Sequence, residues 1–202
     1  HNNDVINVLI NKIKDQYSFY ISNCSDEIQK LKLSDLLEED NEKIDSNSKK
    51  LLIDLAAMPS SSLVIYNYGD SNKLTTNKTI LKKGNILIGL IRPYLKKCLI
   101  SPIDGVTTGT IGQFKIKDEK LQDFIVGIVT SDSFTNYLIS VSTGTKMPVV
   151  KTSDILNYQI SVDQSLLRKC NFTNTVNEII VLNNENYKLT MLKSDYLNKL
   201  FN

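Results

Sequence analysis

Histidine is nearly absent from this sequence of 202 residues, because the only one is His1. General acid–base pairs, Ser–His–Asp triads and histidine-containing metal clusters need that side chain inside the chain, so these arrangements are excluded. Cysteine is also scarce, and Cys24, Cys98 and Cys170 lie far apart and are odd in number. Cysteines of this kind favour reduced thiols in a cytoplasmic protein over a disulfide framework. The sequence therefore predicts neither a metal site nor histidine-based catalysis.

Long apolar runs are missing as well. No run approaches the ~18 residues that a membrane-spanning helix needs, and the chain does not open with the basic and apolar regions of a signal peptide. Hydrophobic residues make up 41% of the chain, which is enough for a buried core in one domain with an appendage or in two small domains. Because the sequence starts with His1 rather than methionine, we expect a fragment or a tag remnant at this end.

Glycine and proline are absent from both ends of the chain. Neither occurs from Asp4 to Leu31, where apolar residues at helical spacing predict a helix that ends near Tyr20. This stripe is typical of a core, and a coiled-coil arm would show the same pattern. Neither occurs from Leu166 to Phe201, where the spacing predicts a helix of about 25 residues or more, about 40 Å long. That length exceeds what a small domain needs for its own core.

The long C-terminal helix carries an apolar stripe that we expect to face a partner helix. Its predicted partner-facing residues are Ile179, Ile180, Asn183, Tyr187, Leu192, Tyr196, Leu197 and Leu200. Asn183 interrupts this stripe in the way that a polar seam residue fixes the register of two helices.

Acidic residues are absent from two stretches. None occurs at residues 71–103, which carry seven positive side chains: Lys73, Lys78, Lys82, Lys83, Arg92, Lys96 and Lys97. None occurs at residues 133–153, which include a polar loop at 142–148. The net charge is only +2, so the distribution of charge, rather than its sum, suggests a nucleic-acid partner. The acids at residues 34–45 would repel phosphate, and we expect them on a solvated face away from DNA.

The middle of the chain reads as short strands separated by turn residues. The expected strands are residues 51–59, 63–68, 79–84 with a turn, 85–91, 95–100, 106–116 and 158–162. The strand at 85–91 is apolar at nearly every position, so we expect it inside a sheet that is covered on both faces. Residues 120–140 follow helical spacing, with a possible cap at residues 130–132. These elements predict an α+β fold with a mixed or antiparallel sheet, an additional N-terminal helix and a long C-terminal helix.

Six segments, in their order and spacing, carry a resemblance to a known family. They are LLIDLAAMP (51–59), KGNILI (83–88), SPIDGVTTGTIGQFKIK (101–117), SDSFTNYLIS (131–140), STGTKMPVVKTSDI (142–155) and YLNKLF (196–201). From about Leu33 to its end, the chain resembles one half of a specificity subunit of the type I restriction–modification systems. Asn85 stands where this family commonly has Asp, which is an isosteric difference.

The resemblance implies a helical segment at residues 1–32, a target recognition domain at 33–163, and a spacer helix at 164–202 that forms a coiled coil. In this family a full subunit repeats the domain and helix, and each domain reads one half of a bipartite DNA site. The implied partners are double-stranded DNA, methyltransferase subunits and a restriction subunit. S-adenosylmethionine would be held by the methyltransferase subunit, with no cofactor in this chain. The chain would be a half-subunit that forms a homodimer, or the second half of a longer subunit.

A domain of this kind uses positive side chains to contact phosphate and loops on rigid strands to read bases. For base contacts we expect Arg92, Tyr94, Thr145 and Lys146, because Arg pairs bidentately with guanine and Thr serves several bases. The other expected DNA contacts are Lys73, Lys78, Lys96, Lys97, Thr143 and Gly144. The alternative for the lysines is an ordinary solubilising surface.

Two other functions fit parts of the sequence. The helices alone would suit a protein–protein scaffold without DNA binding, and the salt dependence of duplex binding separates the two hypotheses. An enzyme would have to use Asp104 with Thr107, Thr108 or Thr110, without a base or a phosphate-cradling glycine motif. A methyltransferase would need an Asn/Asp-Pro-Pro-aromatic motif, which the sequence lacks. We therefore predict a non-catalytic, sequence-specific DNA-binding subunit that directs methyltransferase and restriction subunits to one half of a bipartite site.

Overall fold

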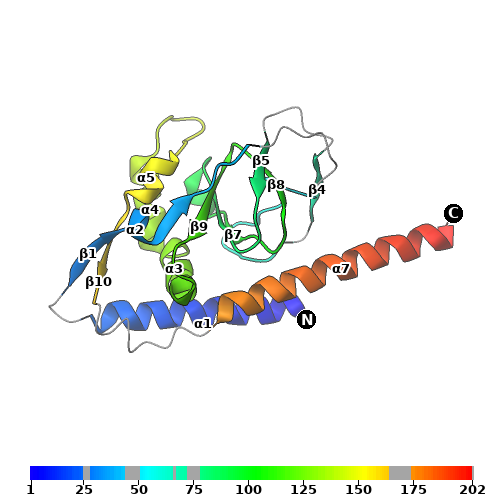
Figure 1. Cartoon of the computed structure of the whole chain (residues 1–202), viewed down its shortest axis with the longest axis horizontal. Helices are drawn as coiled ribbons and strands as arrows, with labels where there is room; N and C mark the ends of the chain where they lie inside the picture. Colours follow the sequence, from blue (N-terminus) through cyan, green and yellow to red (C-terminus); the bar gives the residue numbers. More distant parts are fainter. Residues whose placement is uncertain (25–27, 44–50, 66, 72–77, 164–173, 202) are drawn as a thin grey trace.

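The computed structural model describes residues 1–24, 28–43, 51–65, 67–71, 78–163 and 174–201. In this part of the chain, a body of short strands and helices lies against two long helices, α1 (Asn2–Ser22) and α7 (Thr175–Phe201) (Figure 1). The C-terminal part of α7 projects beyond the body (Figure 1). The α+β fold with a helix at each end is therefore confirmed. The predicted DNA contact Lys73 lies outside the described residues.

The two long helices lie antiparallel, with the start of α1 beside the middle of α7 (Figure 1). Asn2 Nδ2 donates to Glu185 Oε2 (3.3 Å), and Asn186 Nδ2 donates to Asn3 Oδ1 (2.8 Å). Helix α1 buries an apolar face made of Ile6, Leu9, Ile10 and Ile13. These residues have the three- and four-residue spacing of one helical face, which is why the sequence predicted this helix correctly.

The strands of the described residues form two four-stranded sheets and one two-stranded sheet. The first sheet has the order β2 (Leu37–Glu39), β9 (Ile111–Ile116), β6 (Ile86–Gly89) and β7 (Cys98–Ile100), and all its pairs are antiparallel. The second has the order β4 (Gly69–Asp70), β3 (Leu51–Ile53), β8 (Gly105–Thr108) and β5 (Lys78–Leu81), with β3 parallel to β8. The two-stranded sheet pairs β1 (Gln29–Lys32) with β10 (Gln159–Val162). The predicted mixed or antiparallel pairing is confirmed, and β6 is an inner strand as expected.

The other helices in the described part of the chain are short. They are α2 (Leu33–Leu36), η2 (Pro93–Leu95), η3 (Glu119–Leu121), α3 (Gln122–Val129), α4 (Asp132–Val141) and α5 (Thr152–Leu156). The single helix predicted at residues 120–140 is therefore divided, and Ser131 Oγ caps the second part by accepting from the Phe134 N–H (3.2 Å). Among the described helices, none is long and apolar enough by itself to cross a membrane, whereas residues 119–129 and 132–141, bent by 67°, meet that test as a pair.

Helix α3 connects the long helices to the sheets. All eight of its residues are buried, and Figure 1 shows it between α1 and the strands. The Phe124 ring packs edge-on against Tyr20, with 5.0 Å between ring centroids. Gly127 faces Tyr17 so closely that a Cβ atom would lie 2.6 Å from the Tyr17 Cβ. The absence of a side chain at Gly127 is therefore what lets α3 and α1 pack at this distance.

Asp123 of α3 fixes the start of α7. Its two carboxylate oxygens accept from the backbone N–H groups of Thr175 and Val176, both at 3.0 Å. These amides belong to the first turn of α7, where no intrahelical acceptor exists for them. Burial raises the pKa of Asp123, and the two amide hydrogen bonds oppose that shift. A side chain of the body thus takes the place of a local capping residue.

The strands predicted at 51–59 and 63–68 are largely wrong within the described residues. The first covers only Leu51–Ile53, because Asp54 Oδ1 accepts from the Ala57 N–H (2.9 Å) and turns the chain. At residues 63–65 the backbone pairs with a side chain rather than a strand. Asn183 Nδ2 donates to the Leu63 carbonyl (2.9 Å), and the Ile65 N–H donates to Asn183 Oδ1 (3.0 Å). A helix side chain satisfies the groups that a neighbouring strand would otherwise pair.

The Asn183 contacts also correct the predicted partner face of α7. Asn183 is 0% exposed, and Ile179 and Ile180 are 1% and 4% exposed. These three side chains are buried in the core of their own chain, so they cannot contact a second chain. The prediction for these three residues is wrong because the first half of α7 packs against the body of its own chain. The prediction treated the whole apolar stripe of the helix as facing one partner helix.

The strand predicted at 106–116 is two strands in different sheets. β8 ends at Thr108 and β9 begins at Ile111, with a turn at residues 109–110. A Cβ atom at Gly109 would meet nothing within 4 Å. The turn at Gly109 therefore passes the chain from one sheet to the other.

Candidate nucleic-acid interface

The turn after β6 and the loop after α4 lie side by side, although about 50 residues separate them in the sequence. The Arg92 N–H donates to the Pro148 carbonyl (2.8 Å), and the Val150 N–H donates to the Leu90 carbonyl (2.9 Å). Ile91 and Val149 form an antiparallel bridge between them. We call the surface formed by residues 91–96 and 143–149 the hairpin edge. It joins the two segments that the sequence selected for base contacts.

The loop at 143–149 is a hairpin. Thr143 and Val149 each donate a backbone N–H to the carbonyl of the other, both at 2.9 Å. Gly144 has φ +97°, and a Cβ atom there would lie 3.1 Å from the Met147 carbonyl oxygen. A left-handed residue at this position suits glycine, and the close carbonyl adds to that requirement. The predicted contacts Thr143, Gly144, Thr145 and Lys146 are all exposed. Figure 1 shows this loop, between α4 and α5, on the side of the body away from α1 and α7.

The turn at 92–96 has an unusual backbone. Arg92 and Lys96 are left-handed, with φ 53° and φ 50°, and they flank the 3₁₀ turn η2. A residue with a Cβ atom in this conformation costs about 1–2 kcal/mol. The turn is held by the Leu95 N–H donating to the Arg92 carbonyl and by the Lys96 N–H donating to the Pro93 carbonyl, both at 2.9 Å. Strained backbone that the surroundings enforce is characteristic of functional sites. Arg92 and Tyr94 are both exposed on this turn.

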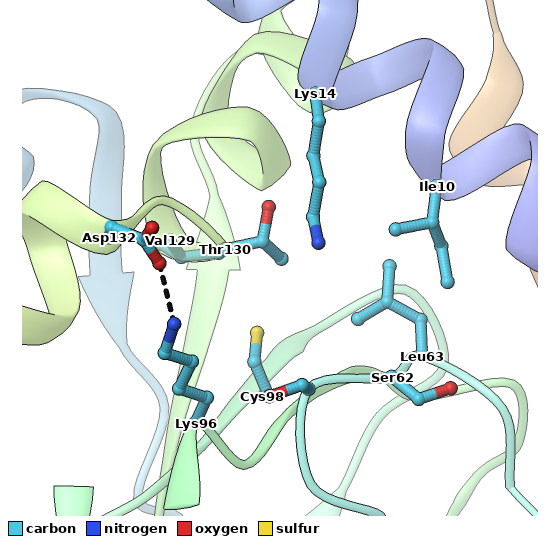
Figure 2. A pocket seen from close by; sticks show the side chains of 10 residues that line it. Ile10, Lys14, Ser62, Leu63, Lys96, Cys98, Val129, Thr130 and Asp132 are labelled. Atoms are coloured by element: carbon cyan, nitrogen blue, oxygen red, sulfur yellow. Dashed lines mark hydrogen bonds and ion pairs between the residues drawn. The ribbon is translucent and has the colours of Figure 1, made fainter. Parts of the chain in front are cut away.

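Two lysines that were predicted to contact phosphate instead bind other groups of the same chain. Lys96 Nζ forms an ion pair with Asp132 (2.5 Å), which Figure 2 shows, and this contact lowers the pKa of Asp132. Lys97 Nζ donates to the Leu55 carbonyl. A phosphate contact by either lysine would require that bond to break. The sequence could not show this, because Asp132 and Leu55 are distant along the chain.

A cavity of about 70 Å³ lies behind the Lys96–Asp132 pair. Its walls come from α1, from the segment at 61–63, from the end of α3 and from Cys98 of β7 (Figure 2). Burial raises the pKa of the Cys98 thiol to about 12, so this thiol stays protonated and unreactive at neutral pH. The cavity has room for a few water molecules but not for a nucleotide.

The stretch at residues 71–103 has no acidic residue of its own, but acidic side chains from another part of the chain contact it. Lys82 Nζ forms ion pairs with Asp40 (3.1 Å) and Glu42 (3.2 Å), and these contacts raise the pKa of Lys82. Part of the acidic segment at 34–45 therefore lies against one of the seven cations of the acid-free stretch. Lys82 is not one of the predicted DNA contacts, and the separation of the acids from DNA stays a prediction. The predicted phosphate contact Lys78 is half-buried on β5 in the second sheet, opposite Thr108. It lies outside the hairpin edge as we define it.

Arg92 and Lys146 are the cations of the hairpin edge that keep their charge uncompensated. Neither forms an ion pair with any residue in the described part of the chain. Both are exposed. Asp104 and Thr107, which an enzyme would have used, hold the body together. Asp104 Oδ1 accepts from the Lys83 N–H (2.9 Å), and Thr107 Oγ1 donates to the Ile53 carbonyl (2.8 Å).

The hairpin edge also carries exposed apolar side chains, two of which were not predicted as contacts from the sequence. Tyr94 and Met147 are each 50% exposed, and Val149 is 37% exposed. Tyr94 is a predicted contact, whereas the sequence did not single out Met147 or Val149. The signal that was available is the position of Met147 beside a proline in a loop that is otherwise polar.

The second half of α7 has an uncovered apolar face. Leu189, Leu192, Tyr196 and Leu200 recur at three- and four-residue steps and are 57–65% exposed, and Leu197 is 42% exposed. Tyr187 lies between the two halves, where its ring packs edge-on against Tyr68 with 4.6 Å between centroids. The predicted partner face is therefore free from Leu192 to Leu200, in contrast to its buried beginning.

Comparison with known proteins finds a shared fold and no sequence match. No protein-family model and no curated protein matches the sequence. The chain is similar to one in a structural study of complex assembly and conformational transition of the type I R-M system, with TM-score 0.61 and 17% identity. It is similar to the HsdS subunit from Thermoanaerobacter tengcongensis, with TM-score 0.59 and 18% identity. A type I S subunit from M. genitalium has TM-score 0.46 and 13% identity over 73% of this chain and 37% of that chain.

The first two matches cover 88% and 87% of this chain and 47% of each solved chain. The chain thus spans about half the length of these structures. The resemblance to type I specificity subunits that the sequence suggested is confirmed in its fold.

Proposed function

We propose that this chain, whose fold is that of the type I restriction–modification specificity subunits, is a unit of such a subunit that reads one half of a DNA site. It would be non-catalytic and cytoplasmic, with double-stranded DNA as its ligand. Methyltransferase subunits would supply S-adenosylmethionine, and a restriction subunit would complete the complex. The observation that carries the proposal is the Arg92–Pro148 backbone bond (2.8 Å). It unites the two segments that carry exposed, uncompensated cations, and Figure 1 shows the loop at 143–149 on the side of the body away from α1 and α7.

The proposed contacts follow from the chemistry of this edge. Arg92 would pair bidentately with guanine in the major groove. Tyr94, Thr145 and Lys146 would make the other base contacts, and Thr143 and Gly144 hold the hairpin that presents them. Lys73 and Lys78 remain proposed phosphate contacts, and Lys96 and Lys97 would join them only after losing their present partners. Because the turn and the hairpin are tied to each other, little ordering cost remains for binding.

The uncovered face of α7 suits a second long helix. Helix α1 already lies antiparallel on the first half of α7 (Figure 1). We propose that a helix in the same orientation covers the second half, either from a second copy of this chain or from the other half of a longer subunit. The exposed side chains at Leu189, Leu192, Tyr196 and Leu200 have the spacing that helix pairs use for their seam.

Duplex binding at several salt concentrations tests the proposed function. A DNA-binding protein should bind the duplex at low salt, and the logarithm of its binding constant should fall linearly with the logarithm of the salt concentration. Arg92→Ala should reduce affinity by about 5- to 150-fold, which corresponds to the 1–3 kcal/mol of a bidentate base contact, and should relax one position of the preferred sequence. Lys193→Ala, which removes an exposed charge from α7, is the matched control and should change little.

The alternative function is a protein–protein scaffold, which the exposed face of α7 favours. Absence of duplex binding at low salt, together with capture of a second helix by α7, would support the scaffold. An Arg92→Ala chain with unchanged affinity and sequence preference would remove Arg92 from the interface.

A further inference from the structure

Exposed apolar side chains are rare in the body of the molecule and concentrated on one edge. Among the described residues from 29 to 163, four large hydrophobic side chains are exposed: Tyr94, Ile139, Met147 and Val149. Three of the four belong to the hairpin edge, within the segments that the Arg92–Pro148 bond joins. Single exposed apolar residues are ordinary on a protein surface. Three on two adjoining segments form the one concentration of such side chains among the described residues from 29 to 163, and a concentration of this kind is where a ligand contact is expected.

The charge around these residues indicates what the ligand is. Lys146 precedes Met147, and Arg92 is two residues from Tyr94, and both cations are exposed. No acidic residue occurs anywhere between Asp132 and Asp154. An apolar tip bordered by cations fits a polyanion that also presents apolar groups. The major groove of DNA has both, because thymine displays a C5-methyl group there.

The shape of the tip favours the major groove over the minor groove. The hairpin is a loop closed by the single Thr143–Val149 bridge, and the major groove, about 12 Å wide, is the groove that admits a protruding protein element. Met147 lies in the tip between Lys146 and Pro148, and Gly144 fixes the bend that exposes it. The flexible thioether side chain adapts its shape to an apolar partner.

On the basis of the function proposed above, we propose that Met147 packs on the C5-methyl group of a thymine, so that the recognised half-site contains a T·A pair at a fixed position. Tyr94 and Val149 border this contact and exclude water from it. Thymine would therefore be distinguished from uracil by this protein. The loss of one buried methyl group corresponds to about a fourfold loss of affinity.

The test replaces thymine by deoxyuridine, which removes only the methyl group. The full chain first selects its preferred sequence from a random duplex pool at low salt, and each thymine of that sequence is then replaced in turn. At one position the wild-type chain should bind the uracil duplex about fourfold more weakly. Met147→Ala should bind both duplexes equally, with the affinity of the wild-type chain for the uracil duplex. Met191→Ala, which removes a 46%-exposed methionine from α7, should behave as wild type.

The experiment gives different results depending on whether only this inference is wrong or the proposed function is wrong as well. If the selected site contains no T·A pair, or if wild type is indifferent to uracil at every position, the methyl contact does not exist and DNA reading still stands. If Met147→Ala keeps the fourfold preference, another side chain reads the methyl group. If no duplex is bound at low salt, the proposed function fails and this inference fails with it. Circular dichroism melting of Met147→Ala separates these results from a folding defect.

Discussion

The side chain of Asn183 in α7 donates to the carbonyl of Leu63 at 2.9 Å, in a position where Asn183 is fully buried. The same amide accepts from the Ile65 N–H at 3.0 Å. One asparagine therefore pairs with both polar groups of an extended segment, as a strand would. Because Asp123 holds the first turn of α7 as well, the helix and the body are fixed to each other at two places.

Replacing Asn183 by Leu should lower the free energy of unfolding by about 2–4 kcal/mol. Two buried backbone groups would lose their hydrogen-bond partner, and each such group costs about 1–3 kcal/mol. Chemical denaturation measures the change. Asn198→Leu, on the exposed part of α7, should stay within about 0.5 kcal/mol of wild type. Equal stability of the two variants would mean that water satisfies Leu63 and Ile65 without Asn183.

Replacing Asp132 by Asn should strengthen duplex binding. The variant replaces the Lys96–Asp132 ion pair by a hydrogen bond to a neutral amide, so Lys96 can exchange that bond for a phosphate contact at a lower cost. The salt dependence should steepen by a slope of about 0.9, the value of one additional phosphate contact. Asp195→Asn on α7 removes an equal charge and serves as the control.

The effect of Asp132→Asn should also depend on pH. Because Lys96 lowers the pKa of Asp132, the carboxylate is ionised above its ordinary pKa and the ion pair is complete there. The pair is lost as the pH falls through the lowered pKa, where wild type and variant should converge. A constant difference between them at every pH would assign the effect to something other than this charge.

Replacing Gly144 by Ala should weaken duplex binding by distorting the hairpin. The backbone at Gly144 has φ +97°, and the new Cβ atom would lie 3.1 Å from the Met147 carbonyl oxygen. Gly84 is a matched control, since it has φ +86° and open space around it. Both substitutions should destabilise the chain by about 1–2 kcal/mol, and only Gly144→Ala should reduce DNA affinity. Equal affinity of the two variants would separate the hairpin from binding.

Replacing Leu192 by Glu should prevent association through α7. Leu192 is 65% exposed, so the substitution should leave the stability of the single chain unchanged. We expect the wild-type chain to self-associate at high concentration in light scattering and the variant to remain monomeric. Thr190→Glu, also exposed on α7, is the control for added charge. A wild-type chain that stays monomeric would leave the other half of a longer subunit as the proposed partner.

Elements decided by local pattern were predicted from the sequence. The apolar spacing of α1 and α7, the fully apolar strand β6 and the Ser131 cap between α3 and α4 each follow from residues close together in the chain. The Arg92–Pro148 backbone bond joins segments that are distant along the chain, and no local signal encodes it.

Features that depend on distant pairing were missed. The Asn183 clamp looked like an intermolecular seam, because a polar residue in an apolar stripe has the same appearance in both roles. The runs without acids suggested free cations, but Lys82 meets Asp40 and Lys96 meets Asp132 in space. The hydrogen-bonded turn at Asp54 ended a strand that composition alone would have continued.

Under the proposed function, the left-handed backbone at Arg92 would restrict how this protein could acquire a new DNA target. Valine, isoleucine and threonine are poorly tolerated at φ 53°, whereas asparagine and glycine adopt this conformation readily. Asparagine pairs with adenine in the groove where arginine pairs with guanine. If Arg92 reads guanine as proposed, an exchange from Arg92 to Asn would be the retargeting step that the fold permits at least cost, and guanine-to-adenine would be the change of specificity that this position could evolve most easily.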